Sequence, residues 1–358
     1  MPFRTAAENL EFLTGARVSE STVRRETLVS GKALAALETK AVDLVEVEAP
    51  VPPPAAAGWL QLSVDGAMVP LVGGQWAEVR TLAVGRLRCG EAGAALKAGD
   101  LSYFSRMTDH ATFTRLATIE THRRNVEQAK TILAVFDGAG WIPEFISVHC
   151  PDAIQILDWA HASGYVHAAG HSVFGETCTS WCTTQLDRLR EGEPIAVLAE
   201  LARLEDSLPD EGPARSSIAQ SLAYLAKRFE QIQYATFIER GYPIGSGIVE
   251  SANRTVVQAR MKGAGMHWAA SSVNPLLALR STVCSDRWRS TWPAIAGQRR
   301  NAERHRRICQ HERRSLAKTI RPRSRRNSKR PPRVVDGKPT KDHAWKRHPA
   351  VTRRRAKL

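Results

Sequence analysis

The sequence predicts an α/β protein in which a mixed β-sheet is flanked by helices. Residues 59–64 alternate apolar and polar side chains, the pattern of a strand with one buried face. Residues 132–136 form an uninterrupted apolar run, as a strand in the middle of a sheet does. Later in the chain, apolar side chains recur at spacings of four, three and four residues, which predicts a helix: Ile218, Leu222, Leu225 and Phe229.

The remaining elements follow in the order of a hairpin, an edge strand, a helix and two strands. Gly73 and Gly74 predict the turn of the hairpin. The expected elements are strands at 59–64, 76–87 and 101–105, a helix at 109–130, and strands at 132–136 and 153–157. This order matches the ribonuclease-H-like topology, so we expect a catalytic core of that type.

Composition divides the chain into segments. Four prolines and four alanines dominate residues 49–58, which predicts a stiff linker. The expected segments are a helix-turn-helix-like DNA-binding part at 1–48, the linker at 49–58, the first part of the core at 59–174, a helical insertion at 175–240, a glutamate-bearing helix and the end of the core at 241–297, and a basic tail at 298–358.

The positive charge of the chain is concentrated at its C-terminal end. The 358 residues carry a net charge of +15, with 51 Lys and Arg against 36 Asp and Glu. Residues 298–358 hold 23 of the basic residues and four acidic ones, while the rest holds 28 and 32. We expect this proline-interrupted tail to be largely disordered and to attract DNA without choosing a sequence.

The N-terminus and the cysteines favour a cytoplasmic protein. No stretch approaches the ~18 consecutive apolar residues of a membrane span, and the first residues lack an apolar signal core. Six cysteines are scattered along the chain, as in proteins without a disulfide framework. One alternative is zinc binding by four residues whose spacing fits no common zinc pattern: His167, His171, Cys178 and Cys182.

Residues 1–48 predict two helices joined by a short turn. Gly15 ends the first helix, and Ser19 is the expected N-cap of a short second helix. In a helix-turn-helix, that second helix would present four side chains to DNA: Ser21, Thr22, Arg24 and Arg25. The alternative is an ordinary helical hairpin that packs on the rest of the protein.

Three carboxylates stand in settings that suit metal-dependent chemistry. Asp65 and Asp137 each end a predicted strand, and Glu250 opens an amphipathic helix. The ends of adjacent parallel strands share one edge of a sheet. Oxygen ligands there suit Mg²⁺ or Mn²⁺, and two such ions lie about 3.5–4 Å apart when they cleave phosphodiesters. The alternatives are ordinary Asp-Gly turns and a solvent-exposed helical glutamate.

Longer motifs surround these carboxylates: Val64-Asp65-Gly66, the run Phe-Asp-Gly-Ala-Gly-Trp-Ile at 136–142, and Tyr-Pro-Ile-Gly-Ser-Gly-Ile-Val-Glu-Ser-Ala-Asn at 242–253. Together they resemble DDE transposases of bacterial insertion sequences, most closely the ISKra-type group, from about residue 13 into the tail. The resemblance implies that Asp65, Asp137 and Glu250 are catalytic and hold two Mg²⁺ or Mn²⁺ ions. It also implies cleavage and strand transfer at the element's terminal repeats, a dimer or larger assembly on DNA, and a nucleoid-associated location in bacterial cytoplasm.

Other motif residues are candidates for supporting roles. Asp158 and His161 follow the next strand in an Asp-aromatic-X-His motif that resembles one in the same family. They would support the metal ligands, contact the scissile phosphate or have a structural role. Four polar residues after Glu250 are expected to contact DNA, with a solvent-exposed helix face as the alternative: Asn253, Arg254, Arg260 and Lys262.

Two other functions agree with the same sequence. One is a metal-dependent nuclease of this fold without transposition. The other is a catalytically silent transposase remnant that only binds DNA. Many proteins of the resembled group carry a further N-terminal segment that this sequence lacks, which favours the remnant, whereas the three carboxylates favour an enzyme.

Overall fold

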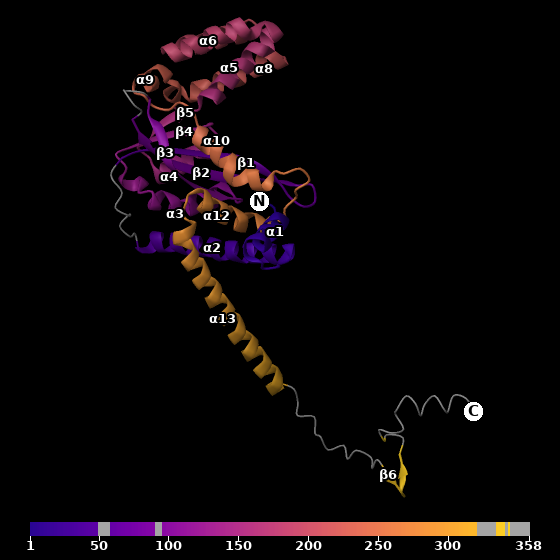
Figure 1. The fold of residues 1–358 in the computed structure, drawn as a ribbon. Helices are drawn as coiled ribbons and strands as arrows, with labels where there is room; N and C mark the ends of the chain where they lie inside the picture. The colour runs from indigo at the N-terminus through magenta and orange to yellow at the C-terminus, as the bar shows by residue number, and fades with distance from the viewer. Residues whose placement is uncertain (49–57, 90–94, 321–333, 341–342, 344–358) are drawn as a thin grey trace, which may run out of the picture. The chain divides into compact units, whose positions relative to one another are not determined.

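A computed structural model describes residues 1–48, 58–89, 95–320, 334–340 and 343 (Figure 1). The chain divides into two compact units, Met1–Arg300 and Asn301–Leu358. The linker expected at 49–58 lies outside the described residues except for Gly58.

The centre of the first unit is a five-stranded mixed sheet with strand order β3-β2-β1-β4-β5. Its strands are β1 (Trp59–Pro70), β2 (Trp76–Arg88), β3 (Lys97–Arg106), β4 (Thr131–Phe136) and β5 (Ile154–Leu157). The first three pair antiparallel, and β4 pairs parallel with both β1 and β5. The predicted α/β class, with a mixed sheet flanked by helices, is confirmed.

Strand β1 is longer than the alternating run predicted. It continues to Pro70, so Asp65 lies inside the strand, opposite Thr81 of β2, and does not end it. The Asp-Gly pair at 65–66 is therefore not a turn. The turn comes at Gly73 and Gly74, whose φ angles of 90° and 75° suit glycine.

Alternation along β1 assigns its side chains to two faces of the sheet. Leu60, Leu62 and Val64 point to one face, where they pack with α3 (His110–Arg123) and α4 (Ile142–His149). The short 3₁₀ helix η2 (Val126–Gln128) follows α3, so the helix predicted at 109–130 is interrupted.

The opposite face carries the segment that contains Glu250. Val69 packs there with Val249 of α10 (Gly247–Ala252) and with the π-helical η5 (Asn253–Gln258). The same layer continues through α11 (Ala259–Met261) and α12 (Ala270–Cys284). Asp65 shares its strand parity with Val69, so its side chain lies on this face.

Helices occupy the insertion predicted at 175–240. Figure 1 shows them grouped beyond the β4–β5 edge of the sheet, together with α5, which precedes them. Ile218 and Leu225 of the predicted stripe are fully buried in their common core. The helices are α5 (Trp159–Phe174), η3 (Gly175–Cys178), α6 (Thr179–Glu191), α7 (Pro194–Asp206), α8 (Pro213–Lys227), η4 (Phe229–Ile232) and α9 (Tyr234–Glu239).

Helices α1 (Phe3–Thr14) and α2 (Glu20–Glu48) form the N-terminal segment. Gly15 ends α1 in the left-handed conformation, and the Ser19 hydroxyl caps α2 by accepting a hydrogen bond from the backbone N–H of Thr22 at 3.2 Å. Both signals were predicted correctly. The second helix is not short, however, because it runs for 29 residues.

Helix α2 packs on the rest of the first unit, so the N-terminal segment is not a separate module. Leu34 shares a small core with Ala278 of α12 and Ile295. Glu38 forms an ion pair with Arg106 of β3 in which both side chains are largely buried. This arrangement agrees with the alternative of a helical hairpin packed on the body.

Gly31 allows the close approach of α2 and α12. A Cβ atom at Gly31 would lie 2.6 Å from the carbonyl carbon of Pro275. We expect Gly31→Ala to lower the free energy of unfolding by about 1–3 kcal/mol in urea denaturation, because backbone must move to admit the methyl group. Gly164→Ala in α5 is the control, since its Cβ meets open space and should stabilise the helix by roughly 0.5–1 kcal/mol. Equal stability of Gly31→Ala and the wild type would contradict the close packing.

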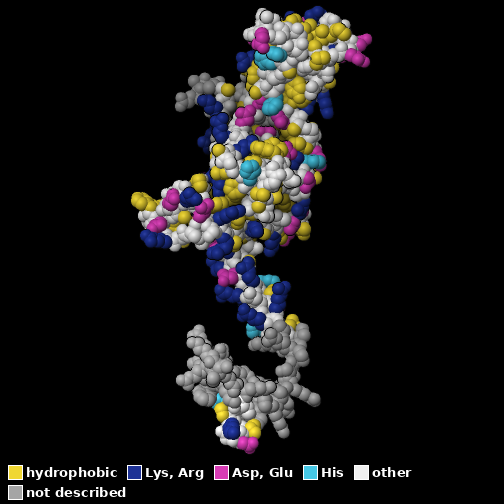
Figure 2. All heavy atoms as spheres, turned by 90° about the vertical axis from the view of Figure 1, so that its right-hand side faces the viewer, with side chains coloured by type: hydrophobic (Ala, Val, Ile, Leu, Met, Phe, Trp, Pro, Cys, Tyr) yellow, Lys and Arg dark blue, Asp and Glu magenta, His cyan; other side chains and the backbone are white. Residues whose placement is uncertain are grey.

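Helix α13 (Trp288–Ile320) passes from the first unit into the second. The predicted tail therefore begins as helix, and residues 298–320 are not irregular. Basic side chains cover this helix (Figure 2). Within the second unit, β6 (Val334–Val335) and β7 (Lys338–Pro339) form a small hairpin around Asp336 and Gly337. Across the described residues, no helix combines the length and apolar character needed to cross a membrane.

Candidate active site

Strand register places three aspartates at one level of the sheet. The last paired residues of β1 and β4 are Leu62 and Ala134, and Asp65 and Asp137 each lie three residues further on. Leu157 of β5 pairs with Phe136, so Asp158 and Asp137 each follow a paired residue directly. Because β1, β4 and β5 run parallel, the three acidic residues lie side by side at the level where β4 and β5 end.

Asp65 is held by two donors in a partly buried position. One carboxylate oxygen accepts the backbone N–H of Gly66 at 2.6 Å, and the other accepts the side-chain amide of Asn253 at 2.7 Å. Burial raises the pKa of Asp65, and the nearby charge of Asp137 raises it further. The two aspartates are thus close enough to repel each other, which is the electrostatic setting that a cation relieves.

Asp137 lies in a turn that the helical insertion holds in place. Its carboxylate accepts the backbone N–H of Ala139 at 2.9 Å. The hydroxyl of Tyr224 donates to the carbonyl of Asp137, and the guanidinium of Arg228 donates to the carbonyl of Gly138. Tyr224 of α8 and Arg228, which directly follows α8, are half-buried; they had no signal in the sequence because they lie 87 and 90 residues from the groups they contact.

Asp158 has a structural role that links two segments of the site. One of its oxygens caps α5 through the backbone N–H of His161 at 3.1 Å, and the other accepts the N–H of Ser246 at 2.5 Å. Ser246 directly precedes α10, so Asp158 anchors the start of the helix that carries Glu250. Burial would raise the pKa of Asp158, but the hydrogen bond with the His161 ring, followed by those from Ser246 and from the His161 backbone, lowers it well below the usual range.

His161 is the cation of this cluster when it is protonated. Its ring nitrogen Nδ1 lies 3.4 Å from Asp158, and its side chain is 47% exposed. The hydrogen bond to Asp158 raises the pKa of His161 despite partial burial, and the charges of Asp137 and Asp65 act in the same direction. The predicted supporting pair is therefore brought together beside the two aspartates.

Glu250 does not join Asp65 and Asp137 in this structure. Its side chain is exposed on α10, although the helix itself packs on the sheet through Val249 and Ala252. No three His, Cys, Asp or Glu side chains of the described ranges gather closely enough to hold a metal ion. This finding covers the predicted carboxylate triad and also the alternative zinc set at 167–182.

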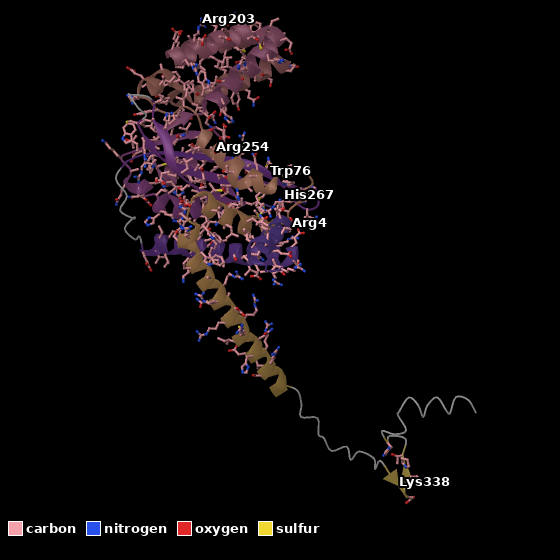
Figure 3. All side chains as sticks on the ribbon, viewed as in Figure 1. Arg4, Trp76, Arg203, Arg254, His267 and Lys338 are labelled. Atoms are coloured by element: carbon pink, nitrogen blue, oxygen red, sulfur yellow. The ribbon has the colours of Figure 1, made fainter. Side chains whose placement is uncertain are left out.

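The residues predicted to contact DNA after Glu250 divide into two groups. Arg254 and Lys262 are exposed, and Figure 3 labels Arg254 on its helix. Asn253 and Arg260 are buried, with 3% and 7% of their surface exposed, so they do not lie on an open basic face. The π-helical turn at 253–258 changes the helical period of this segment, so the four residues do not share one face.

The N-terminal candidates lie on the surface near the start of α2. Ser21, Arg24 and Arg25 are exposed, and Thr22 is half-buried. Arg25 forms an exposed ion pair with Glu26 at 3.3 Å. These four side chains remain accessible to a partner even though the middle of α2 packs on the body.

The donor set around Asp65 and Asp137 suits a hard divalent cation. Both donors are carboxylate oxygens, which Mg²⁺ and Mn²⁺ prefer. Neither carboxylate forms an ion pair with Lys or Arg among the described residues. In addition, the buried Oδ1 of Asn253 has no hydrogen-bond partner in the described part of the protein. Two aspartates and an unpartnered amide oxygen therefore fit such an ion, whereas Glu250 would have to move to complete the set.

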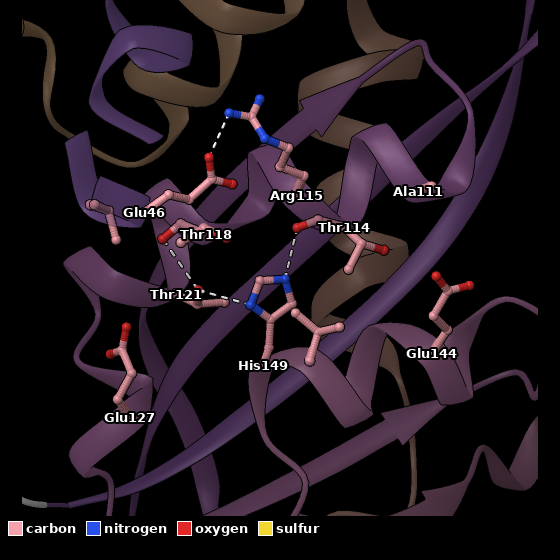
Figure 4. A pocket seen from close by; sticks show the side chains of 11 residues that line it. Glu46, Ala111, Thr114, Arg115, Thr118, Thr121, Glu127, Glu144 and His149 are labelled. Carbon is pink, nitrogen blue, oxygen red and sulfur yellow. Dashed lines mark hydrogen bonds and ion pairs between the residues drawn. The ribbon is translucent and has the colours of Figure 1, made fainter. Parts of the chain in front are cut away.

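A separate cavity of about 500 Å³ lies on the other face of the sheet, between α2, α3 and α4 (Figure 4). His149 lies in its wall and makes hydrogen bonds with Thr121 and with the carbonyl of Thr114. Burial lowers the pKa of this histidine. Because its two ring nitrogens are already bonded within the protein, we assign no function to this cavity.

Comparison with known proteins assigns no family or function, so the function proposed below depends on the geometry of the site and on the sequence motifs. No protein-family model matches the chain, and no curated protein is significantly similar to it.

Proposed function

We propose that the protein is a DDE transposase of the ISKra-type group, with a ribonuclease-H-like core that cleaves and transfers DNA strands. The observation that carries the proposal is the pairing of Asp65 and Asp137 at one level of adjacent parallel strands, close enough to repel each other. The strand order and the helix at 247–252 that packs on the sheet are compatible with this core. The motifs around the three carboxylates support it as well.

Each part of the site has a place in this chemistry. Asp65 and Asp137 would hold Mg²⁺ or Mn²⁺, and Glu250 would complete the ligand set when DNA is bound. The ions would activate the attacking oxygen and stabilise the leaving oxygen of the phosphodiester. Asn253 and Gly66 orient the Asp65 carboxylate, while Tyr224 and Arg228 fix the turn of Asp137.

DNA would be held by exposed basic residues outside the cluster. Arg254 and Lys262 lie on the segment after Glu250 and are free to contact phosphates. The exposed start of α2, with Ser21, Thr22, Arg24 and Arg25, would contact the terminal repeats. The basic helix and tail beyond Asn301 would add affinity for any sequence. Reaction at two element ends requires two sites, so we expect a dimer or larger assembly on DNA.

The exposed position of Glu250 favours one further candidate, a protein that binds the terminal repeats without cutting them. A nuclease without strand transfer is the remaining alternative. An assay with DNA that carries both inverted repeats of the element distinguishes these three candidate functions. We expect Mg²⁺-dependent cleavage at the repeat ends followed by joined products. Cleavage without joining favours the nuclease, and specific binding without cleavage favours the silent remnant.

The C-terminal unit provides a test of general DNA affinity. Deletion of 301–358 leaves Arg299, which pairs with Glu26, in the first unit. We expect the truncated protein to bind all DNA more weakly and to show a flatter dependence of log K on log salt, since the slope scales at roughly 0.9 per neutralised phosphate. Fluorescence anisotropy over a salt series measures the slope. An unchanged slope would show that this unit does not touch DNA.

A further inference from the structure

A positively charged cleft of about 190 Å³ lies between α1, α2, α11 and α12, apart from the acidic candidate active site. We call it the two-arginine cleft, because Arg260 of α11 and Arg280 of α12 are its charged side chains; the α-amino group of Met1 also lies there, and burial together with the charges of these two arginines lowers its pKa. Its other walls are mainly apolar, with Phe3 from α1 and Val23 from α2 among them. Every lining residue belongs to the unit Met1–Arg300.

Arg260 is an unusual residue because it is buried without an acidic partner. Only 7% of its surface is exposed. Its guanidinium lies between the rings of Phe3 and Trp268, 4.5 and 4.8 Å from their centroids. Among the residues that the structure describes, its Nη2 has no hydrogen-bond partner and no carboxylate forms an ion pair with it. Burying an unpaired charge is costly, and the two aromatic rings compensate only in part.

Arg280 adds a second positive charge to the same cleft. Its guanidinium donates one hydrogen bond to the backbone carbonyl of Thr255, while its Nε is buried with no partner in the described ranges. Burial lowers the pKa of Arg260, and the charge of Arg280 lowers it further. The two cations therefore repel each other in a partly dry cleft where the described residues supply no counter-charge.

We propose that the two-arginine cleft binds a phosphate group. Guanidinium groups bind tetrahedral oxyanions through their N–H donors. In this cleft, Nη2 of Arg260 and Nε of Arg280 supply N–H donors that have no partner among the described residues. Two positive charges suit phosphate better than a single carboxylate. The phosphate has two conceivable sources, free phosphate and the backbone of bound DNA, and only the second rests on the proposed function. Thr255 connects this cleft to the active site, because it belongs to the same π-helical turn as Asn253.

The first test uses inorganic phosphate and the full-length protein. Phosphate is expected to raise the melting temperature of the wild type relative to chloride at equal ionic strength. Arg260→Met keeps the contacts with Phe3 and Trp268 but removes the charge. We expect this variant to lose the phosphate-induced shift, to bind phosphate at least about tenfold more weakly, and to be no less stable than the wild type without phosphate. Arg280→Met should lose the shift as well.

Lys32→Met is the matched control, because it removes one positive charge from an exposed position on α2 that has no proposed role in binding DNA. It should keep the phosphate-induced shift. A lower melting temperature of Arg260→Met with an undiminished phosphate shift would overturn the proposal and make Arg260 a packing residue.

A second measurement distinguishes the sources of the phosphate. Binding of a short duplex is compared for the wild type, Arg260→Met and Lys32→Met, with and without inorganic phosphate. If the DNA backbone occupies the cleft, Arg260→Met weakens DNA binding more than Lys32→Met does, and phosphate competes. Equal DNA binding by the two variants, with the phosphate shift still specific to Arg260, assigns the cleft to free phosphate. Absence of both effects refutes the site without bearing on strand cleavage.

Discussion

Asp137→Asn is expected to reduce DNA strand cleavage roughly a thousandfold or more, while folding and DNA binding persist. The loss follows because a neutral amide binds a divalent ion more weakly than the carboxylate it replaces, and the ions supply several kcal/mol of transition-state stabilisation. The asparagine carbonyl still accepts the N–H of Ala139, so the turn keeps its conformation. Cleavage of terminal-repeat DNA in Mg²⁺, with anisotropy as the binding control, measures the effect.

Asp65→Asn should give the same loss of cleavage through a different local adjustment. The new amide would face the amide of Asn253, which now donates to Asp65. A flip of Asn253 resolves the conflict, because its Oδ1 has no partner among the described residues and then accepts from the new amide. Glu250→Gln tests whether the exposed glutamate joins the site. Near-normal cleavage by any of the three variants would remove that residue from the active site.

Glu120→Gln is expected to lower the free energy of unfolding by about 3–5 kcal/mol at neutral pH. The Glu120 side chain is fully buried in α3. It accepts two hydrogen bonds from Arg287, at 2.7 and 2.8 Å, and one from Arg123 at 2.8 Å. Neutralising the carboxylate leaves both arginines without their partner. Urea denaturation followed by circular dichroism measures the cost.

The same ion pair predicts a dependence of stability on pH. Burial alone would raise the pKa of Glu120, but the charge and hydrogen bonds of Arg287, with the charge of Arg123, outweigh it and lower the pKa. A group with a lowered folded-state pKa stabilises the protein fully above its unfolded pKa, about 4.3 here, and loses that contribution as pH falls through the folded value. The difference between wild type and Glu120→Gln should therefore shrink in acid.

Glu127→Gln is the control for this prediction. Glu127 is 43% exposed and pairs only with His122 among the residues described, at 3.2 Å. Its replacement should cost less than about 1 kcal/mol. If Glu120→Gln unfolds at the same urea concentration as Glu127→Gln, the buried ion pair does not stabilise the fold.

Local patterns predicted the start of elements better than their ends. The alternation at 59–64 identified β1, but the strand continues to Pro70 because β2 pairs with it along its whole length. Gly15 correctly marked the end of α1 and Ser19 the start of α2, whereas the end of α2 was predicted far too early. Nothing in the sequence indicated that Gly31 would bring α2 against α12, since that contact is between distant segments.

The candidate site was predictable where it depends on strand ends and unpredictable where it depends on long-range contacts. The apolar run before Asp137 located the end of β4, and the strand register places Asp65 and Asp158 at the same level. Tyr224 and Arg228 donate to the turn at Asp137 and Gly138 from the helical insertion, so their roles in holding this turn follow only from the fold.

A metal-specificity switch at Asp137 tests directly whether this carboxylate binds the catalytic ion. Asp137→Cys replaces the hard oxygen ligand with a thiolate, which accepts Mn²⁺ more readily than Mg²⁺. The measurement is cleavage of terminal-repeat DNA by the wild type and the variant, each with Mg²⁺ and with Mn²⁺. We predict that the wild type cleaves with both ions and that the variant cleaves measurably only with Mn²⁺. Activity of the variant that does not depend on which ion is supplied would contradict coordination by Asp137.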